Sequence, residues 1–225
     1  MSERTRTYTL HPPSGFLGAP SVGLDSVAPG DIVLCGYFCD NLGGGPAGAR
    51  FLARQLRYFS EDDVPPEGVR DIGDLNVFPL EPEKHEEAIS DQLAMIRKAA
   101  AIPVLVGGDA SGVEIMARHW SPGLPTPVVR VDGAKNSSLE AAEGPSLIAV
   151  DLSSLGCGLG QRGATATPQT LIRSLEVLAD GHIGGALYGL APALDWAGAG
   201  ETRVAKAVLA TLVGSLQGRA QHAAA

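Results

Sequence analysis

The chain has 225 residues, of which 44% are hydrophobic and only 19% are charged. This length and composition favour one packed domain and exclude intrinsic disorder as the main theme. The 25 acidic and 17 basic residues give a formal net charge of −8, and no stretch is rich in lysine or arginine, so a nucleic-acid partner is disfavoured.

The amino-terminal segment 1–10 is too polar for a secretory signal, and no apolar run approaches the roughly 18 residues that a membrane span needs. The three cysteines are few for this length and cannot all pair with one another, which fits a reducing compartment. We therefore expect a soluble cytoplasmic protein.

Residues 1–29 contain several prolines and glycines without a sustained period, so we expect an extended arm there. A single domain is predicted over 30–217 and a flexible tail over 218–225. Within the domain, short apolar runs typical of buried strands alternate with stretches of helical spacing. In chain order we predict a strand over 31–38, a helix over 49–59, a strand over 69–72, a helix over 82–100, a strand over 102–106, a helix over 111–120, strands over 128–131 and 147–150, a helix over 167–178, a strand over 183–189 and a helix over 201–216.

Strands that alternate with helices predict an α/β domain, in which a mainly parallel sheet lies between two layers of helices. In such sheets ligands bind beyond the carboxyl ends of the strands. Asp109, Asp132 and Asp151 each stand at or just past the end of an apolar run. The three carboxylates are therefore expected to meet at one edge of the sheet.

The order of the motifs resembles the ureohydrolase family of arginase and agmatinase. In chain order, the segments that carry the resemblance are Gly45-Pro-Ala-Gly-Ala-Arg50, Val104-Leu-Val-Gly-Gly-Asp-Ala-Ser111, Val129-Arg-Val-Asp-Gly-Ala-Lys-Asn136, Ile148-Ala-Val-Asp-Leu-Ser-Ser-Leu155, Thr165-Ala-Thr-Pro168 and Ala191-Pro-Ala-Leu-Asp195. The resemblance implies a three-layer, arginase-like fold. It also implies a chemistry in which two manganese ions hold a hydroxide that attacks a guanidinium carbon.

The resemblance places metal ligands at six positions, and only two of them keep the family's residue. Asp132 and Asp151 match aspartates that bridge the two ions in the family. The other four positions, which carry two histidines and two aspartates in active members, hold Ala110, Ala134, Asn136 and Ser153. Two carboxylates without an imidazole cannot hold two divalent ions tightly. We expect no cofactor, or at most one weakly bound divalent metal.

Two further departures concern charge and substrate recognition. The Lys135 ammonium would repel a cation and could pair with Asp132 or Asp151. Gly189 stands where the resemblance places a substrate-facing glutamate. Only 14 residues, 137–150, separate the two former ligand clusters, whereas this interval is several times longer in working members and carries substrate-recognition segments.

Each aspartate has more than one interpretation. Asp109 is expected either to accept hydrogen bonds from backbone amides of its turn or to contact a substrate. Asp132 and Asp151 are expected to form a pair neutralised by Lys135 or by turn donors, to hold one weak metal ion, or to carry acid–base catalysis with Lys135 assisting.

The main functional prediction is a ureohydrolase-like pseudoenzyme that acts as a regulatory or scaffolding subunit. The expected partner is a second copy of the chain or an active paralogue, since the family commonly forms trimers and hexamers. Neither nucleic acid nor a membrane is expected as a partner. The alternative prediction is a remodelled hydrolase or lyase, metal-free or with one metal, that acts on a small guanidino or amino compound. A third is a sensor that binds a small cationic ligand without turning it over.

Overall fold

The computed structural model describes residues 15–121, 123–132, 145–155, 166–178, 182–192 and 200–223, the last range with side chains up to 217. Within these ranges six parallel strands form one sheet in the order β2-β1-β3-β6-β5-β4. The strands are β1 (Ile32–Gly36), β2 (Val69–Asp74), β3 (Ile102–Val106), β4 (Val128–Val131), β5 (Ser146–Asp151) and β6 (His182–Tyr188). The helices are α1 (Leu52–Tyr58), α2 (Pro82–Lys98), α3 (Ser111–His119), α4 (Pro168–Glu176) and α5 (Gly200–Ala223).

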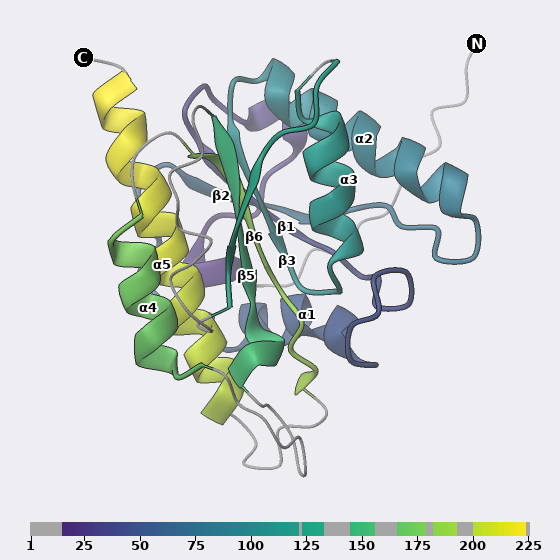
Figure 1. Ribbon diagram of the computed structural model, residues 1–225. Coiled ribbons are helices and arrows are strands. Elements are labelled where there is room, and N and C mark those ends of the chain that lie inside the picture. The colour runs from purple at the N-terminus through teal and green to yellow at the C-terminus, as the bar shows by residue number, and fades with distance from the viewer. Residues whose placement is uncertain are drawn as a thin grey trace.

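Helices cover both faces of the sheet, with α4 and α5 on one side and α2 and α3 on the other (Figure 1). Successive strand residues point to opposite faces, so that in β1 Ile32 and Leu34 pack on the side of α1 and α5, while Val33 packs on the side of α2 and α3. Both halves of the core are apolar, which explains the nearly continuous apolar runs of the strands. The predicted three-layer α/β/α architecture with a parallel sheet is confirmed.

The helix starts follow from local sequence signals. Pro82 occupies the first turn of α2, where its missing N–H costs no hydrogen bond. At the start of α4 the Thr167 side chain accepts a hydrogen bond from the backbone N–H of Thr170, at 3.1 Å. Both helices were predicted from these residues and from the apolar stripes behind them, and both are confirmed.

Residues 15–29 of the predicted arm pack on the domain. Phe16 and Leu17 are buried, and the backbone N–H of Val22 donates to the carbonyl of Asp71 in β2, at 2.9 Å. This part of the arm therefore contributes apolar side chains to the core and runs beside the edge strand of the sheet. Residues 1–14 lie outside the described residues.

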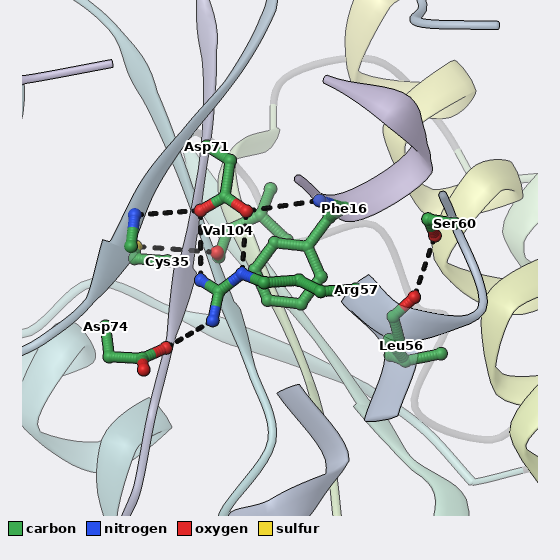
Figure 2. Close-up of polar contacts among 9 residues, drawn as sticks. Phe16, Cys35, Leu56, Arg57, Ser60, Asp71, Asp74 and Val104 are labelled. Atoms are coloured by element: carbon green, nitrogen blue, oxygen red, sulfur yellow. Dashed lines mark hydrogen bonds and ion pairs between the residues drawn. The ribbon is translucent and has the colours of Figure 1, made fainter. Parts of the chain in front are cut away.

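A buried ion pair joins α1, β2 and the arm. The Arg57 guanidinium is 2% exposed and donates to both carboxylate oxygens of Asp71, from Nε at 2.7 Å and from Nη2 at 2.9 Å. It also donates to Asp74, and the Phe16 ring lies against its flat face, 4.0 Å from the ring centroid to Cζ (Figure 2). Burial alone would lower the pKa of Arg57, but the contacts with Asp71 and Asp74 raise it overall, so the guanidinium is charged.

Candidate functional site

The carboxyl ends of β4, β5 and β6 bring several polar side chains to one edge of the sheet. Asp151 at the end of β5 is in register with Tyr188 at the end of β6, and Val131 of β4 is in register with Val150. Asp132 therefore follows β4 beside Asp151. By strand alternation Arg130 and Asp132 share the face on which Tyr188 packs, the face covered by α2 and α3. We call Arg130, Asp132, Asp151 and Tyr188 the rim cluster.

The Tyr188 hydroxyl is the centre of the rim cluster. It accepts a hydrogen bond from Arg130 Nη1 at 3.1 Å. Burial raises the pKa of Tyr188, and the negative charges of Asp151 and Asp132 raise it further against an opposing effect of Arg130. Both carboxylates thus act on one hydroxyl, as expected from their positions at the ends of neighbouring strands. The phenol remains protonated at neutral pH and can donate one hydrogen bond.

The Asp151 carboxylate is held by its own turn. Its Oδ1 accepts a hydrogen bond from the backbone N–H of Ser153 at 2.9 Å. Gly189 adjoins it with φ of +84°, and a Cβ built there would lie 2.5 Å from Asp151 Oδ1. A side chain at position 189 would therefore collide with the carboxylate, so the place that the resemblance gives to a glutamate has no room for one.

Asp109 is separate from the rim cluster in its contacts. It is buried, and its Oδ2 accepts hydrogen bonds from the backbone N–H groups of Leu42 at 3.0 Å and Gly43 at 2.7 Å. Its Oδ1 accepts from Ser111, from the backbone N–H at 3.0 Å and from the hydroxyl. The protein supplies all of these donors, which favours the interpretation of Asp109 as a structural residue that fastens the glycine-rich turn to the start of α3.

A buried hydrogen-bond chain leads away from Asp109, and sequence analysis missed it. The backbone N–H of Phe78 donates to His85 Nδ1 at 3.1 Å, so the ring proton resides on Nε2. Nε2 lies 2.9 Å from the Tyr37 hydroxyl, which lies 2.6 Å from Ser111 Oγ. Protons therefore point from His85 to Tyr37, from Tyr37 to Ser111 and from Ser111 to Asp109. No spacing signal links positions so far apart in the chain.

The buried His85 of this hydrogen-bond chain is expected to make the free energy of unfolding depend on pH. Burial lowers the pKa of His85, although the charges of Asp109 and Glu86 oppose the shift. An unfolded histidine titrates near pH 6.5, so below about that pH the unfolded state binds the proton more tightly than the folded state. The free energy of unfolding is therefore expected to be unaffected by His85 above that pH and to decrease as the pH falls below it.

Urea unfolding at a series of pH values, for the wild type and for His85→Gln, measures this effect. The wild type is expected to lose stability faster than the variant between neutral and mildly acidic pH, because only the wild type carries the buried imidazole. His119→Gln removes an exposed imidazole that pairs with Glu86, and it shows how much of a pH effect a surface histidine contributes. Parallel pH profiles for the wild type and His85→Gln would contradict the assignment.

The donor set at the former ligand positions does not fit two divalent ions. Ala110 precedes the first residue of α3 and offers no ligand atom, and Ser153 offers a neutral hydroxyl. In the part of the chain that the structure describes, no three His, Cys, Asp or Glu side chains are placed to hold a metal. Ala134, Lys135 and Asn136 lie outside the described residues. Among the described residues, Arg130 is a cation that acts on the Tyr188 hydroxyl together with Asp132 and Asp151.

Comparison with solved structures identifies the fold. The chain superposes on proclavaminate amidino hydrolase from Streptomyces clavuligerus with a TM-score of 0.70 and 17% identity, over 93% of this chain and 98% of that one. It superposes on a hypothetical agmatinase from Burkholderia thailandensis with a TM-score of 0.75 and 15% identity, over 96% and 94%. For the formimidoylglutamase from Bacillus subtilis the values are 0.65 and 12%, over 96% of each chain.

At these identities the superpositions show the fold alone, and the predicted arginase-like α/β fold is confirmed. No protein-family model matches the chain, and no curated protein matches it. None of the helices within the described ranges has both the length and the apolar character of a membrane span.

Proposed function

We propose that this chain, which has the arginase-like fold of the ureohydrolases, is a member of that family without a dimanganese site. In this proposal it acts in the cytoplasm by association, as a regulatory or scaffolding subunit that pairs with a second copy or with an active paralogue. The observation that carries the proposal is the set of possible metal ligands at the carboxyl edge of the sheet. Ala110 follows Asp109 there, and of the family's ligands the carboxylates of Asp132 and Asp151 are kept.

The contacts of the remaining polar groups support the same proposal. Arg130 and the Tyr188 hydroxyl lie beside Asp132 and Asp151, so the rim cluster contains its own positive charge. A cation entering this cluster would meet the guanidinium as well as the carboxylates. Asp109 is fully engaged with backbone and serine donors. These contacts within the protein support the proposal of an edge of the sheet that does not depend on a dimanganese site.

Elemental analysis after purification in manganese-supplemented buffer tests the proposal. We expect well under one manganese ion per chain and no hydrolysis of arginine or agmatine, because the imidazole ligands are replaced. A near-stoichiometric manganese content would overturn the proposal. Turnover of a guanidino or amino compound that is lost in Asp151→Asn would favour the remodelled hydrolase instead.

A further inference from the structure

Residues 76–81 lead from the end of β2 to the start of α2, and we call them the latch segment. They follow the carboxyl end of a parallel strand, so they lie at the same edge of the sheet as the glycine-rich turn after β1. The residues of the latch segment are exposed or half-buried, and Leu80 is 91% exposed. With so little buried surface, the place of the segment depends mainly on its polar contacts.

The most buried polar partner of the latch segment is His85 on α2. The backbone N–H of Phe78 donates to His85 Nδ1 at 3.1 Å, and His85 is 1% exposed. Within the described residues, the other side chains that contact the segment through a hydrogen bond or a charge are half-buried or exposed, and they are Asn41, Lys84 and Gln92. The hydrogen bond to His85 is therefore the one best shielded from water.

This hydrogen bond requires the neutral form of His85. Nδ1 accepts from Phe78, so the ring proton is on Nε2 and points to the Tyr37 hydroxyl, 2.9 Å away. Burial raises the pKa of Tyr37, so its hydroxyl stays protonated. A second proton on His85 would reside on Nδ1 and face the N–H of Phe78, so that two donors would meet. The contact of Nε2 with Tyr37 would persist, because Nε2 keeps its proton.

Charged and titratable groups surround His85 on several elements. They are Tyr37 after β1, Glu81 in the latch segment, Lys84 and Glu86 on α2, Asp109 before α3, and Arg118 and His119 at the end of α3. Burial lowers the pKa of His85, and the charges of Asp109 and Glu86 oppose that effect without reversing it. Asp109 accepts from the glycine-rich turn and Ser111, and Glu86 accepts from the two basic side chains of α3. Both carboxylates are therefore engaged elsewhere.

We propose that His85 is a pH-operated latch, in which a second proton on the imidazole below neutral pH detaches the latch segment from α2 while the sheet stays folded. Histidine is the side chain whose charge ordinarily changes in this pH range. The detached segment also loses the contact between the Pro79 carbonyl and Asn41, which joins it to the glycine-rich turn. The carboxyl edge of the sheet then opens beside β1 and β2. The inference goes beyond the proposed function, since the latch needs neither a partner nor a metal.

The size of the effect follows from proton linkage. In the detached form His85 is open to water and titrates near pH 6.5, whereas in the closed form it binds the second proton more weakly. The closed form is therefore unaffected by His85 above that pH and loses stability as the pH falls below it. The population of the detached form is expected to rise at least about threefold between pH 7 and pH 5.

Hydrogen exchange of the Phe78 amide, followed by NMR at pH 7 and pH 5 with and without a low concentration of urea, tests the latch. Exchange is expressed as a protection factor, which removes the intrinsic pH dependence of amide exchange. We expect the protection of Phe78 to fall at least about threefold on acidification and to be insensitive to urea, because a local opening exposes little surface. The amides of β3 are expected to be better protected and sensitive to urea. Unchanged protection of Phe78 in acid, or a urea dependence equal to that of β3, would overturn the latch.

Two variants assign the effect to one imidazole. His85→Gln offers an acceptor to Phe78 and a donor to Tyr37 without titrating, so its Phe78 protection is expected to be the same at both pH values. His119→Gln removes the neighbouring imidazole that pairs with Glu86 and is expected to behave like the wild type. Acid-induced exchange that persists in His85→Gln, or that is lost in His119→Gln, would contradict the assignment.

The nitrogen NMR spectrum of the imidazole tests the latch without any substitution. In the wild type at neutral pH we expect His85 to carry its proton on Nε2, and we expect its conversion to the cation to coincide with the faster exchange of Phe78. A proton on Nδ1 at neutral pH would overturn the latch even if His85→Gln fails to fold. The manganese content tests the proposed function separately and has no bearing on these results.

Discussion

Replacing Arg57 with methionine is expected to lower the free energy of unfolding by about 3–5 kcal/mol. The variant keeps the apolar stem of the side chain but removes the guanidinium and its positive charge, and this leaves the buried Asp71 carboxylate without its main partner. Asp71 would retain the backbone N–H donors of Phe16 at 3.1 Å and Gly73 at 2.8 Å. Urea denaturation of the purified variant, followed by circular dichroism, measures the loss.

Two further variants identify the ion pair as the cause. Arg54→Met changes an exposed arginine of the same helix and is expected to alter stability by less than about 0.5 kcal/mol. Asp71→Asn removes the charge and keeps one acceptor oxygen, which can serve the N–H group of either Phe16 or Gly73. In the double variant Arg57→Met/Asp71→Asn the two losses are expected to be non-additive by about 1–3 kcal/mol, because the uncompensated charge is gone. Additive losses would show that Arg57 stabilises the protein by packing on Phe16 and not by pairing with Asp71.

The same cluster explains why Cys35 is expected to be inert. Burial raises the pKa of the Cys35 thiol, and the charge of Asp71 raises it further. The thiolate is the reactive species, so a buried thiol with a raised pKa neither binds a metal nor reacts with oxidants at neutral pH.

The fold was predictable because its signals are local. Most of the strands are short apolar runs that are buried on both faces, β2 and β4 being more polar, and the helices carry an apolar stripe or a capping residue such as Thr167. The meeting of Asp132 and Asp151 was also predictable, since parallel strands end at the same edge of the sheet. Neither prediction needed knowledge of which way a particular side chain turns.

The contacts of the site were less predictable because they join distant segments. Asp109 binds amide groups that lie 66 and 67 residues earlier in the chain, and their positions depend on how the glycine-rich turn folds back. Arg130 and Tyr188 are polar residues of largely apolar strands, and the register of β4, β5 and β6 brings them together. Phe16 stands among glycines and prolines without a period, so its burial beneath Arg57 had no sequence signal.

Removing the Asp109 carboxylate is expected to cost about 2–4 kcal/mol of unfolding free energy. In Asp109→Ala the N–H groups of Leu42, Gly43 and Ser111 lose their acceptor, and that of Ser111 loses it in a buried position. The Ser111 hydroxyl loses its acceptor as well, which breaks the last step of the chain from His85. Thermal and urea unfolding measure the loss of stability.

Asp109→Asn distinguishes a structural role from contact with a ligand. An asparagine oxygen can serve either the pair of amides in the glycine-rich turn or Ser111, but its NH2 group then faces the donors on the other side. We therefore expect a loss of stability close to that of Asp109→Ala, although the shape is preserved. Asp132→Asn, which changes a half-buried carboxylate of the rim cluster, is the matched control and is expected to have a smaller effect. Wild-type stability in both Asp109 variants would mean that the backbone donors do not depend on this carboxylate, and the predicted contact with a small cationic substrate would then be the better interpretation of the residue.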